Sequence, residues 1–381
     1  MATRKLTDNW PAHLGGASPK GQGEVVKGRR ANDDAVTPDG SSRDAADKWA
    51  AYVAGDENIF FPALVALVSL EEHNPGVFDR FMVFSGDRKT AQMDALLERY
   101  GIFFIDAASL KAHEVAMSLA PMEGEEGRWP VEVFLNWILP EHFYAQGYRY
   151  SLKLDYDTLT IGEFPTSAFE RQPFSLAAKQ VDIRRGFPED AVVKAKAELG
   201  QDVSFTEYYN VGVVVFDNSR AAEVEFFDWF ASLYRLLSEA CRDVQGLPPM
   251  EQLCFAALAK NLGGVKTLSP RLHTKVNVTR NIDPGFTSGT VILHFHSPFK
   301  PWKPLSPAEV VMLTEKKRWP MLPFYRTVWL DYASRVEGFA DFCDQQPYTA
   351  IEIMCLANTV LLVEKKMIAS MRLEEAAQSP S

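Results

Sequence analysis

The sequence predicts an α/β fold, built on a mostly parallel central sheet flanked by helices. Two observations lead to this prediction. Short apolar runs alternate along the chain with amphipathic helical patterns, and the 381 residues are 46% hydrophobic and 24% charged, as in a globular protein with a sizeable core. Sheets of this type bind ligands at the carboxyl ends of their strands. Polar residues that directly follow an apolar run are therefore the first candidates for a functional site.

The expected elements follow one another in regular order from about Trp49 onwards. Pro62 opens a helix after the first apolar run, and Gly101 stops a second helix whose apolar side chains fall on one face. The expected strands are Ala50–Ala54, Arg80–Ser85, Phe103–Asp106, Tyr150–Leu154, Phe174–Ala178, Val211–Phe216 and Val291–His296. The expected helices are Pro62–His73, Thr90–Tyr100, Val131–Ala145, Asp190–Leu199, Arg220–Cys241 and Met250–Lys260.

Changes in composition divide the chain into three expected parts. Residues 1–45 are rich in Gly, Ser, Pro, Asp and basic residues without apolar periodicity, which is typical of a disordered or loosely attached tail. Residues 46–305 carry the α/β pattern and form the expected main domain. Residues 306–381 form an expected C-terminal helical extension, in which Ile351–Leu373 is strongly amphipathic. We expect that segment to pack on the main domain or in a homo-oligomer, with peripheral membrane contact as the alternative.

Charge, hydropathy and cysteine content argue against nucleic-acid-binding, membrane-spanning and disulfide-stabilised proteins. A formal net charge of -10 disfavours a nucleic-acid partner. The first residues lack the apolar run of a signal peptide, and no stretch approaches the ~20 apolar residues of a transmembrane segment. The 4 cysteines form no close pair and predict neither a zinc site nor a disulfide framework. We therefore expect a cytoplasmic protein.

The segment Tyr150–Ile161 (YSLKLDYDTLTI) places two carboxylates directly after an apolar strand. Asp155 and Asp157 are two residues apart, so in an extended segment they point to the same side. Such a pair suits a hard divalent cation such as Mn2+ or Mg2+. The alternative is two solvated aspartates in a turn, because this short pattern arises easily by chance in an acidic chain. The position at the end of an apolar strand favours the metal site.

A second polar cluster follows the last expected strand, within Val291–Trp302 (VILHFHSPFKPW). His294 at a strand end is a candidate third metal ligand, and Lys300 in the Pro-rich turn is a candidate cation for a phosphate. Taken alone, the pattern is better explained by a core histidine and a surface lysine. Beside the paired aspartates, the metal and phosphate interpretation is favoured.

Four segments together resemble glycosyltransferase family 8, the family of glycogenin, galactinol synthase and bacterial lipopolysaccharide galactosyl- and glucosyltransferases. Tyr52–Asn58 (YVAGDEN) looks like the family's nucleoside-binding first strand, and Asp155–Asp157 looks like its DxD motif. Tyr209–Asn218 (YNVGVVVFDN) looks like its FNAGV strand, and Val291–Trp302 looks like its HFxGxxKPW signature. The resemblance covers about two-thirds of the chain. It implies a GT-A fold, a UDP-sugar donor, a divalent cation and retention of the anomeric configuration.

The resemblance also implies roles for individual residues. The implied metal ligands are Asp155, Asp157 and His294. The implied catalytic residues, near the donor sugar, are Asn210, Glu251 and Gln252. The implied residues that bind the nucleotide-sugar, with or without the cation, are Ala54, Asp56, Asn58, Asp155, Tyr156, Asp157, Gly212, His294, Ser297 and Lys300.

Three positions depart from the family pattern. Ser297 stands where the family usually has glycine, which affects a close backbone approach to phosphate. Leu253 replaces one acid of a DQD segment that otherwise falls on Glu251 and Gln252. Glu132 falls near the place of a frequent arginine, with Arg128 as the alternative residue for that role. These departures leave the metal and diphosphate roles intact and leave the donor sugar open.

The expected function is that of a metal-dependent retaining glycosyltransferase that moves a hexose from a UDP-sugar to a glycan, lipid-linked or small-molecule acceptor. No well-placed nucleophile is evident, which favours front-face attack with the leaving phosphate as base; Glu251 as nucleophile is the alternative. Two other classes stay open. A metal-dependent nucleotidyltransferase would want a Gly-rich basic phosphate loop, whereas the loop here is GDENIFFP. A non-catalytic nucleotide-sugar or glycan-binding protein is compatible with Ser297 and Leu253.

Overall fold

The computed structural model describes residues 48–119, 131–170, 172–181, 187–204, 208–242, 244, 249–276, 289–296, 300–304 and 321–345, with the side chains of 321–324 and 327 excepted. All of them fall within the unit Ser41–Ser381. The expected tail, residues 1–45, and the amphipathic segment Ile351–Leu373 lie outside the described residues. The boundaries of the three expected parts stay predictions.

A seven-stranded, mostly parallel sheet forms the centre of the described structure. Six of its strands run in one direction, and β7 alone is antiparallel to both of its neighbours. The fold class predicted from the sequence is therefore confirmed. In the order in which they lie side by side, the strands are β3 (Ile102–Asp106), β2 (Phe78–Phe84), β1 (Trp49–Ala54), β4 (Tyr150–Leu154), β7 (Tyr208–Asp217), β6 (Leu176–Val181) and β8 (Lys266–Thr267).

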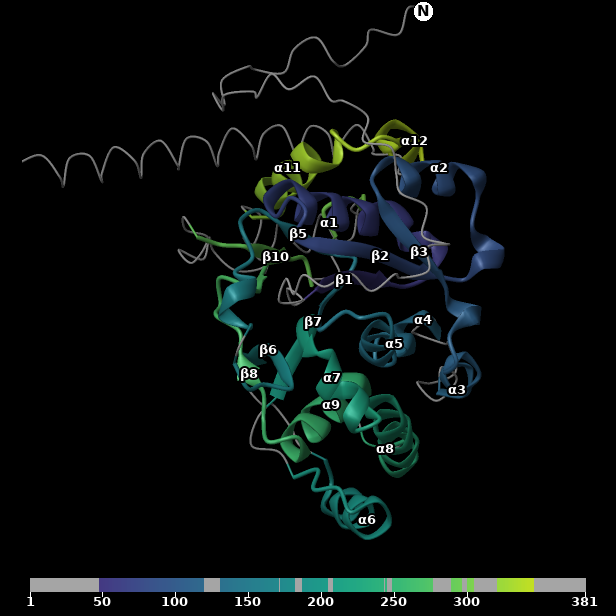
Figure 1. Cartoon of the computed structure of the whole chain (residues 1–381), viewed down its shortest axis with the longest axis vertical. Helices are drawn as coiled ribbons and strands as arrows, with labels where there is room; N and C mark the ends of the chain where they lie inside the picture. The colour runs from purple at the N-terminus through teal and green to yellow at the C-terminus, as the bar shows by residue number, and fades with distance from the viewer. Residues whose placement is uncertain are drawn as a thin grey trace, which may run out of the picture. The chain divides into compact units, whose positions relative to one another are not determined.

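The sheet is covered on both faces, which explains why its central strands are apolar throughout. In β1 every residue is buried, and successive side chains enter two different cores: Ala51 and Val53 one, Tyr52 and Ala54 the other. Two groups of helices supply these cores (Figure 1). The first group is α1 (Phe60–His73), α2 (Ala91–Arg99), α11 (Met321–Ala333) and α12 (Phe339–Asp344). The second group is α3 (His113–Leu119), α4 (Val131–Leu135), α5 (Leu139–Ala145), α6 (Glu189–Leu199), α7 (Asn218–Glu223), α8 (Phe226–Ala240) and α9 (Met250–Asn261).

A second sheet, of three short strands in the described residues, stands beside the large one. Its central strand β10 (Ile292–His294) pairs antiparallel with β5 (Thr158–Thr160) and parallel with β9 (Thr274–Lys275). Because β5 begins directly after the Asp155–Asp157 segment, this sheet joins that segment to a part of the chain more than 130 residues further on.

Two predicted helices are wrong as single helices. The segment Val131–Ala145 forms α4 and α5, because Pro140 has no backbone N–H to donate and is accommodated only in the first turn of a new helix. The segment Arg220–Cys241 forms α7 and α8, which are separated at Glu225, a residue in the left-handed region with φ 51°. The other predicted strands and helices fall on observed ones, with ends that differ by a few residues.

Each helix in the described part of the chain is too short or too polar to cross a bilayer.

Candidate active site

Asp155 and Asp157 lie in a tight turn at the carboxyl end of β4. The backbone N–H of Thr158 donates to the carbonyl of Asp155 at 3.1 Å and closes the turn. The N–H of Asp155 donates to the carbonyl of Gly212 in β7 at 2.8 Å, and this bond prolongs the β4–β7 ladder by one residue. The two carboxylates therefore converge, as expected from the sequence, but the cause is a turn and not an extended strand.

His294 reaches this turn through the pairing of β10 with β5. His294 lies opposite Thr158 in the ladder, and the N–H of Phe295 donates to the carbonyl of Asp157 at 2.8 Å. His294 Nε2 is 3.2 Å from Asp157 Oδ1 and 3.6 Å from Asp155 Oδ2. One ligand atom from each of the three residues falls within 4.8 Å of the others, which is the spacing of a metal site.

Asp157 carries an unusual electrostatic environment. It is 4% exposed, and its Oδ1 has no well-formed hydrogen bond among the described residues. Its Oδ2 forms an ion pair with Lys300 Nζ, which also donates to the carbonyl of Phe295 at 2.9 Å. Burial alone would raise the pKa of Asp157, but His294 and Lys300 outweigh it and hold this pKa well below its usual value. Asp157 is therefore an anion at any pH near neutrality.

Lys153 is a member of this site that the sequence reasoning missed. It lies on β4 and is 1% exposed, and its Nζ donates to Asp155 Oδ1 at 2.6 Å and to the carbonyl of Val211 at 2.8 Å. Each of the two aspartates thus has a lysine partner. The signal that could have found Lys153 is a lysine in the middle of an otherwise apolar buried strand, because lysine is almost never buried without a charged partner.

An irregular stretch of β7 shapes the same site. The register with β6 jumps from Val214 opposite Ala178 to Asn210 opposite Lys179, so the intervening residues leave that ladder. Asn210 bridges the gap, since its Oδ1 accepts from the N–H of Gly212 at 3.1 Å. At Gly212 a Cβ atom would lie 2.2 Å from Cε1 of His294 and 2.9 Å from Asp155 Oδ2. Gly212 is therefore needed so that those two side chains can approach the strand.

His273 is a second residue that the sequence reasoning missed. It is fully buried, its Nε2 lies 2.8 Å from His294 Nδ1, and the two rings stack with centroids 5.0 Å apart. Burial, followed by the neighbouring charges of His294, Lys179 and Lys275, lowers the pKa of His273 well below its usual value. No feature of the sequence around His273 distinguishes it, since it lies in a loop outside the four motif segments.

The residues expected near the nucleoside lie at the end of the neighbouring strand. Ala54 is the last residue of β1, which pairs parallel with β4, so Asp56 and Asn58 follow at the same edge of the sheet as Asp155. Asp56 accepts from the N–H of Asn58 at 3.0 Å and begins a short 3-10 turn. Burial and the two flanking aspartates raise the pKa of Tyr156 well above its usual value, so its phenol stays neutral.

The remaining expected site residues are described by contacts with residues other than Asp155 and Asp157. Gln252, on the first turn of α9, accepts a hydrogen bond from the hydroxyl of Tyr208, the first residue of β7. Glu251 beside it is buried. Burial also raises the pKa of Glu132, and the nearby Asp56 adds to the effect. Ser297 lies outside the described residues.

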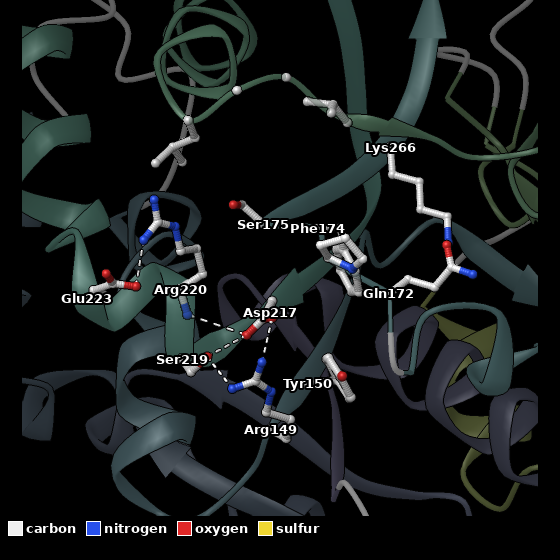
Figure 2. Close-up of a pocket in the computed structure, with 15 residues that line it drawn as sticks. Arg149, Tyr150, Gln172, Phe174, Ser175, Asp217, Ser219, Arg220, Glu223 and Lys266 are labelled. Atoms are coloured by element: carbon white, nitrogen blue, oxygen red, sulfur yellow. Dashed lines mark hydrogen bonds and ion pairs between the residues drawn. The ribbon is translucent and has the colours of Figure 1, made fainter.

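A separate pocket of about 940 Å³ lies at the opposite end of the sheet, where β4 begins and β7 ends. Figure 2 shows its charged side chains bound to one another: Arg149 pairs with Asp217, whose side chain is nearly buried, and Arg220 pairs with Glu223. The third cation, Lys266, donates to a main-chain carbonyl. The residues expected for catalysis and donor binding do not line this pocket. Apart from Lys266, its charged side chains instead form ion pairs with one another near the ends of β4 and β7.

No protein-family model and no curated protein matches the sequence. Comparison with solved structures finds several of similar fold. A complex of the galactosyltransferase LgtC with donor and acceptor sugar analogues has 17% identity and a TM-score of 0.49, over 76% of this chain and 96% of that chain. The glycosyltransferase GlyE of Streptococcus pneumoniae has 17% identity and a TM-score of 0.46, over 78% and 63%. Mouse xyloside xylosyltransferase 1 has 12% identity and a TM-score of 0.43, over 65% and 98%.

Proposed function

We propose that this protein is a metal-dependent retaining glycosyltransferase that moves a hexose from a UDP-sugar to an acceptor. The observation that carries the proposal is the convergence of Asp155, Asp157 and His294 at the carboxyl end of β4, with Lys300 beside them. This is the edge at which sheets of this class bind their ligands. The order of the four motif segments along the chain supports the same activity.

The donor set fits a divalent cation. Two carboxylates and one imidazole suit Mn2+ better than Mg2+, which prefers oxygen ligands alone. The buried Oδ1 of Asp157, which lacks a well-formed hydrogen bond among the described residues, is an oxygen that a cation would satisfy. A bound cation would stabilise the negative charge that develops on the departing diphosphate.

The protein's own groups would orient the donor and neutralise it. Lys300 has a side chain 12% exposed, so its ammonium is close enough to the surface to exchange Asp157 for a phosphate oxygen. Asp56 and Asn58 would hold the nucleoside at the end of β1. Asn210 and Gly212 would border the donor sugar, and Ser297 and Ala54 would complete the nucleotide contacts.

For the chemical step we favour front-face attack by the acceptor, with the leaving phosphate as base. Gln252 would stabilise the cationic sugar from α9. The competing route is a covalent intermediate on Glu251, and the variant Glu251→Gln separates the two routes. Near-normal turnover in that variant excludes Glu251 as the nucleophile, whereas accumulation of a glycosylated wild-type protein excludes front-face attack.

The central experiment is UDP release from a panel of UDP-sugars with Mn2+, with glycan, lipid-linked and small-molecule acceptors. The double variant Asp155→Ala/Asp157→Ala and an EDTA-treated sample are the blanks. Release from one donor that disappears in both blanks supports the proposal and identifies the sugar.

Two other outcomes would replace the proposal. Metal-dependent UDP binding without turnover across the panel favours a non-catalytic nucleotide-sugar or glycan-binding protein. Absence of UDP binding, together with pyrophosphate release from a nucleoside triphosphate, favours a metal-dependent nucleotidyltransferase.

A further inference from the structure

His273 touches the candidate metal site without facing the place where a cation would sit. Its Nε2 is 2.8 Å from Nδ1 of His294, while the other ring nitrogen of His294 faces the two aspartates at 3.2 and 3.6 Å. The two nitrogens of His294 are thus divided between two partners. A histidine that binds a metal through one nitrogen has its orientation fixed by the hydrogen bond at the other nitrogen.

We propose that His273 is the positioning residue of the metal site: it fixes the ring orientation and the tautomer of His294, and leaves Nε2 of His294 for the cation. The proposal rests on the function proposed above only in that it takes a divalent cation to bind at Asp155, Asp157 and His294.

The backbone around His273 holds it in place for this contact. Strand β9 begins at the next residue and pairs with β10, with Lys275 opposite His294. The N–H of Val276 donates to the carbonyl of His294 at 2.9 Å, and the N–H of Val291 donates to the carbonyl of Arg271 at 2.8 Å. These bonds lie on both sides of the histidine pair, so the position of His273 follows from the second sheet.

The proton between the two rings decides whether His294 can bind a cation. A bond between two imidazole nitrogens needs one proton. If that proton is on Nδ1 of His294, His273 accepts it, and Nε2 of His294 has a free lone pair. If it is on Nε2 of His273, the neutral His294 keeps its own proton on Nε2, where a cation cannot bind. His273 suits this role because its Nε2 can accept the proton from Nδ1 of His294.

A third contact restricts the His294 ring from the side of β7. A Cβ atom at Gly212 would lie 2.5 Å from Nδ1 of His294, so the main chain of Gly212 borders the edge of the ring that His273 binds. The His294 ring therefore occupies the space that a side chain at residue 212 would need, and its hydrogen bond to His273 fixes the orientation of the ring there.

The test is Mn2+ binding by the full chain without any sugar nucleotide, measured from the electron paramagnetic resonance signal of free Mn2+. The variants are His273→Leu, which removes the hydrogen bond, and His273→Gln, whose amide oxygen can accept near the position of Nε2. The matched control is His296→Leu, because His296 contacts the His294 ring edge-on with centroids 5.7 Å apart. Thermal unfolding without metal checks that each variant is folded.

We expect His273→Leu to bind Mn2+ about 10–100-fold more weakly than the wild type. We expect His273→Gln to recover most of that loss and His296→Leu to stay close to the wild type. Equal affinity of His273→Leu and wild type would overturn the proposal, as would a Gln variant as weak as the Leu variant. If the wild type binds Mn2+, His273→Leu binds it more weakly by this factor, and no donor is turned over, this inference stands and the proposed transferase activity fails.

Discussion

Lys153 Nζ lies 2.6 Å from Asp155 Oδ1, in an ion pair whose lysine is buried and whose aspartate is partly exposed. Replacement of Lys153 by Met leaves Asp155 without this partner. We expect the free energy of unfolding, measured in urea without metal, to fall by about 1–3 kcal/mol, less than for a fully buried pair because water reaches Asp155.

The same variant should respond more strongly to Mn2+ than the wild type does. A bound cation supplies positive charge beside Asp155 and stabilises only the folded state, so Mn2+ should recover part of the lost stability. Lys89→Met is the control, since the partly buried Lys89 forms an ion pair with the exposed Asp94 and not with a residue of the candidate site. An equal loss with and without Mn2+ would show that Lys153 does not act on the metal ligands.

Gly212→Ala tests the space between β7 and the metal ligands. The added Cβ atom would lie 2.2 Å from Cε1 of His294, so His294 or the strand must shift. We expect UDP release to fall about a hundredfold, because small displacements of a catalytic constellation have effects of this size, and Mn2+ binding to weaken in parallel.

Gly200→Ala is the matched control for that variant. Gly200 ends α6 with φ 66° and has open space around it, so alanine there costs about 1–2 kcal/mol of stability without touching the site. Its Mn2+ affinity should equal that of the wild type. Unchanged Mn2+ affinity in Gly212→Ala would contradict the close approach of His294 to β7.

The fold was largely predictable because each buried strand or helix is marked by a run of apolar residues within its own stretch of sequence. Apolar runs such as Tyr150–Leu154 coincide with strands buried on both faces. The breaks in two predicted helices were harder. Pro140 gives a local signal, whereas the left-handed conformation of Glu225, directly before the buried Phe226 and Phe227 of α8, has no marker in the sequence.

The candidate site was predictable only where a motif marks it. Asp155, Asp157 and His294 were found through their neighbours in sequence. Their contact depends on the pairing of β5 with β10, which composition does not reveal. Lys153 has a weak signal, a lysine inside an apolar strand, which points to a charged partner but does not name Asp155. His273 has no pattern of its own along the chain, because its contact with His294 forms only through the second sheet.

Glu141 should make stability depend on pH. Burial raises the pKa of Glu141 to about 6, although the hydrogen bond from the N–H of Phe227 opposes the shift. Between about pH 4.5 and 6 the carboxyl is protonated in the folded protein and ionised in the unfolded chain. The folded state then binds more protons, so this contribution to stability falls as pH rises through that window and stays low above it.

Glu141→Gln removes this dependence and keeps an oxygen that accepts from Phe227. In urea unfolding from pH 4.5 to 8, we expect the variant to gain stability relative to the wild type up to about pH 7 and to keep a constant advantage above it. Glu98→Gln, at an exposed position on α2, should run parallel to the wild type. A difference between Glu141→Gln and wild type that does not change with pH would refute the prediction.

Trp329 links α11 to the candidate site. It is fully buried, with ring centroids 5.0 Å from Trp302, and Trp302 in turn contacts Tyr156 at 5.9 Å. Trp329→Ala should lower the free energy of unfolding by about 3–5 kcal/mol, and UDP release should fall because Trp302 follows Lys300 by two residues. Tyr144→Ala, at an exposed aromatic residue, should change stability by less than about 0.5 kcal/mol. Equal effects of the two variants would mean that Trp329 of α11 adds no more to the stability of the core than an exposed aromatic residue does.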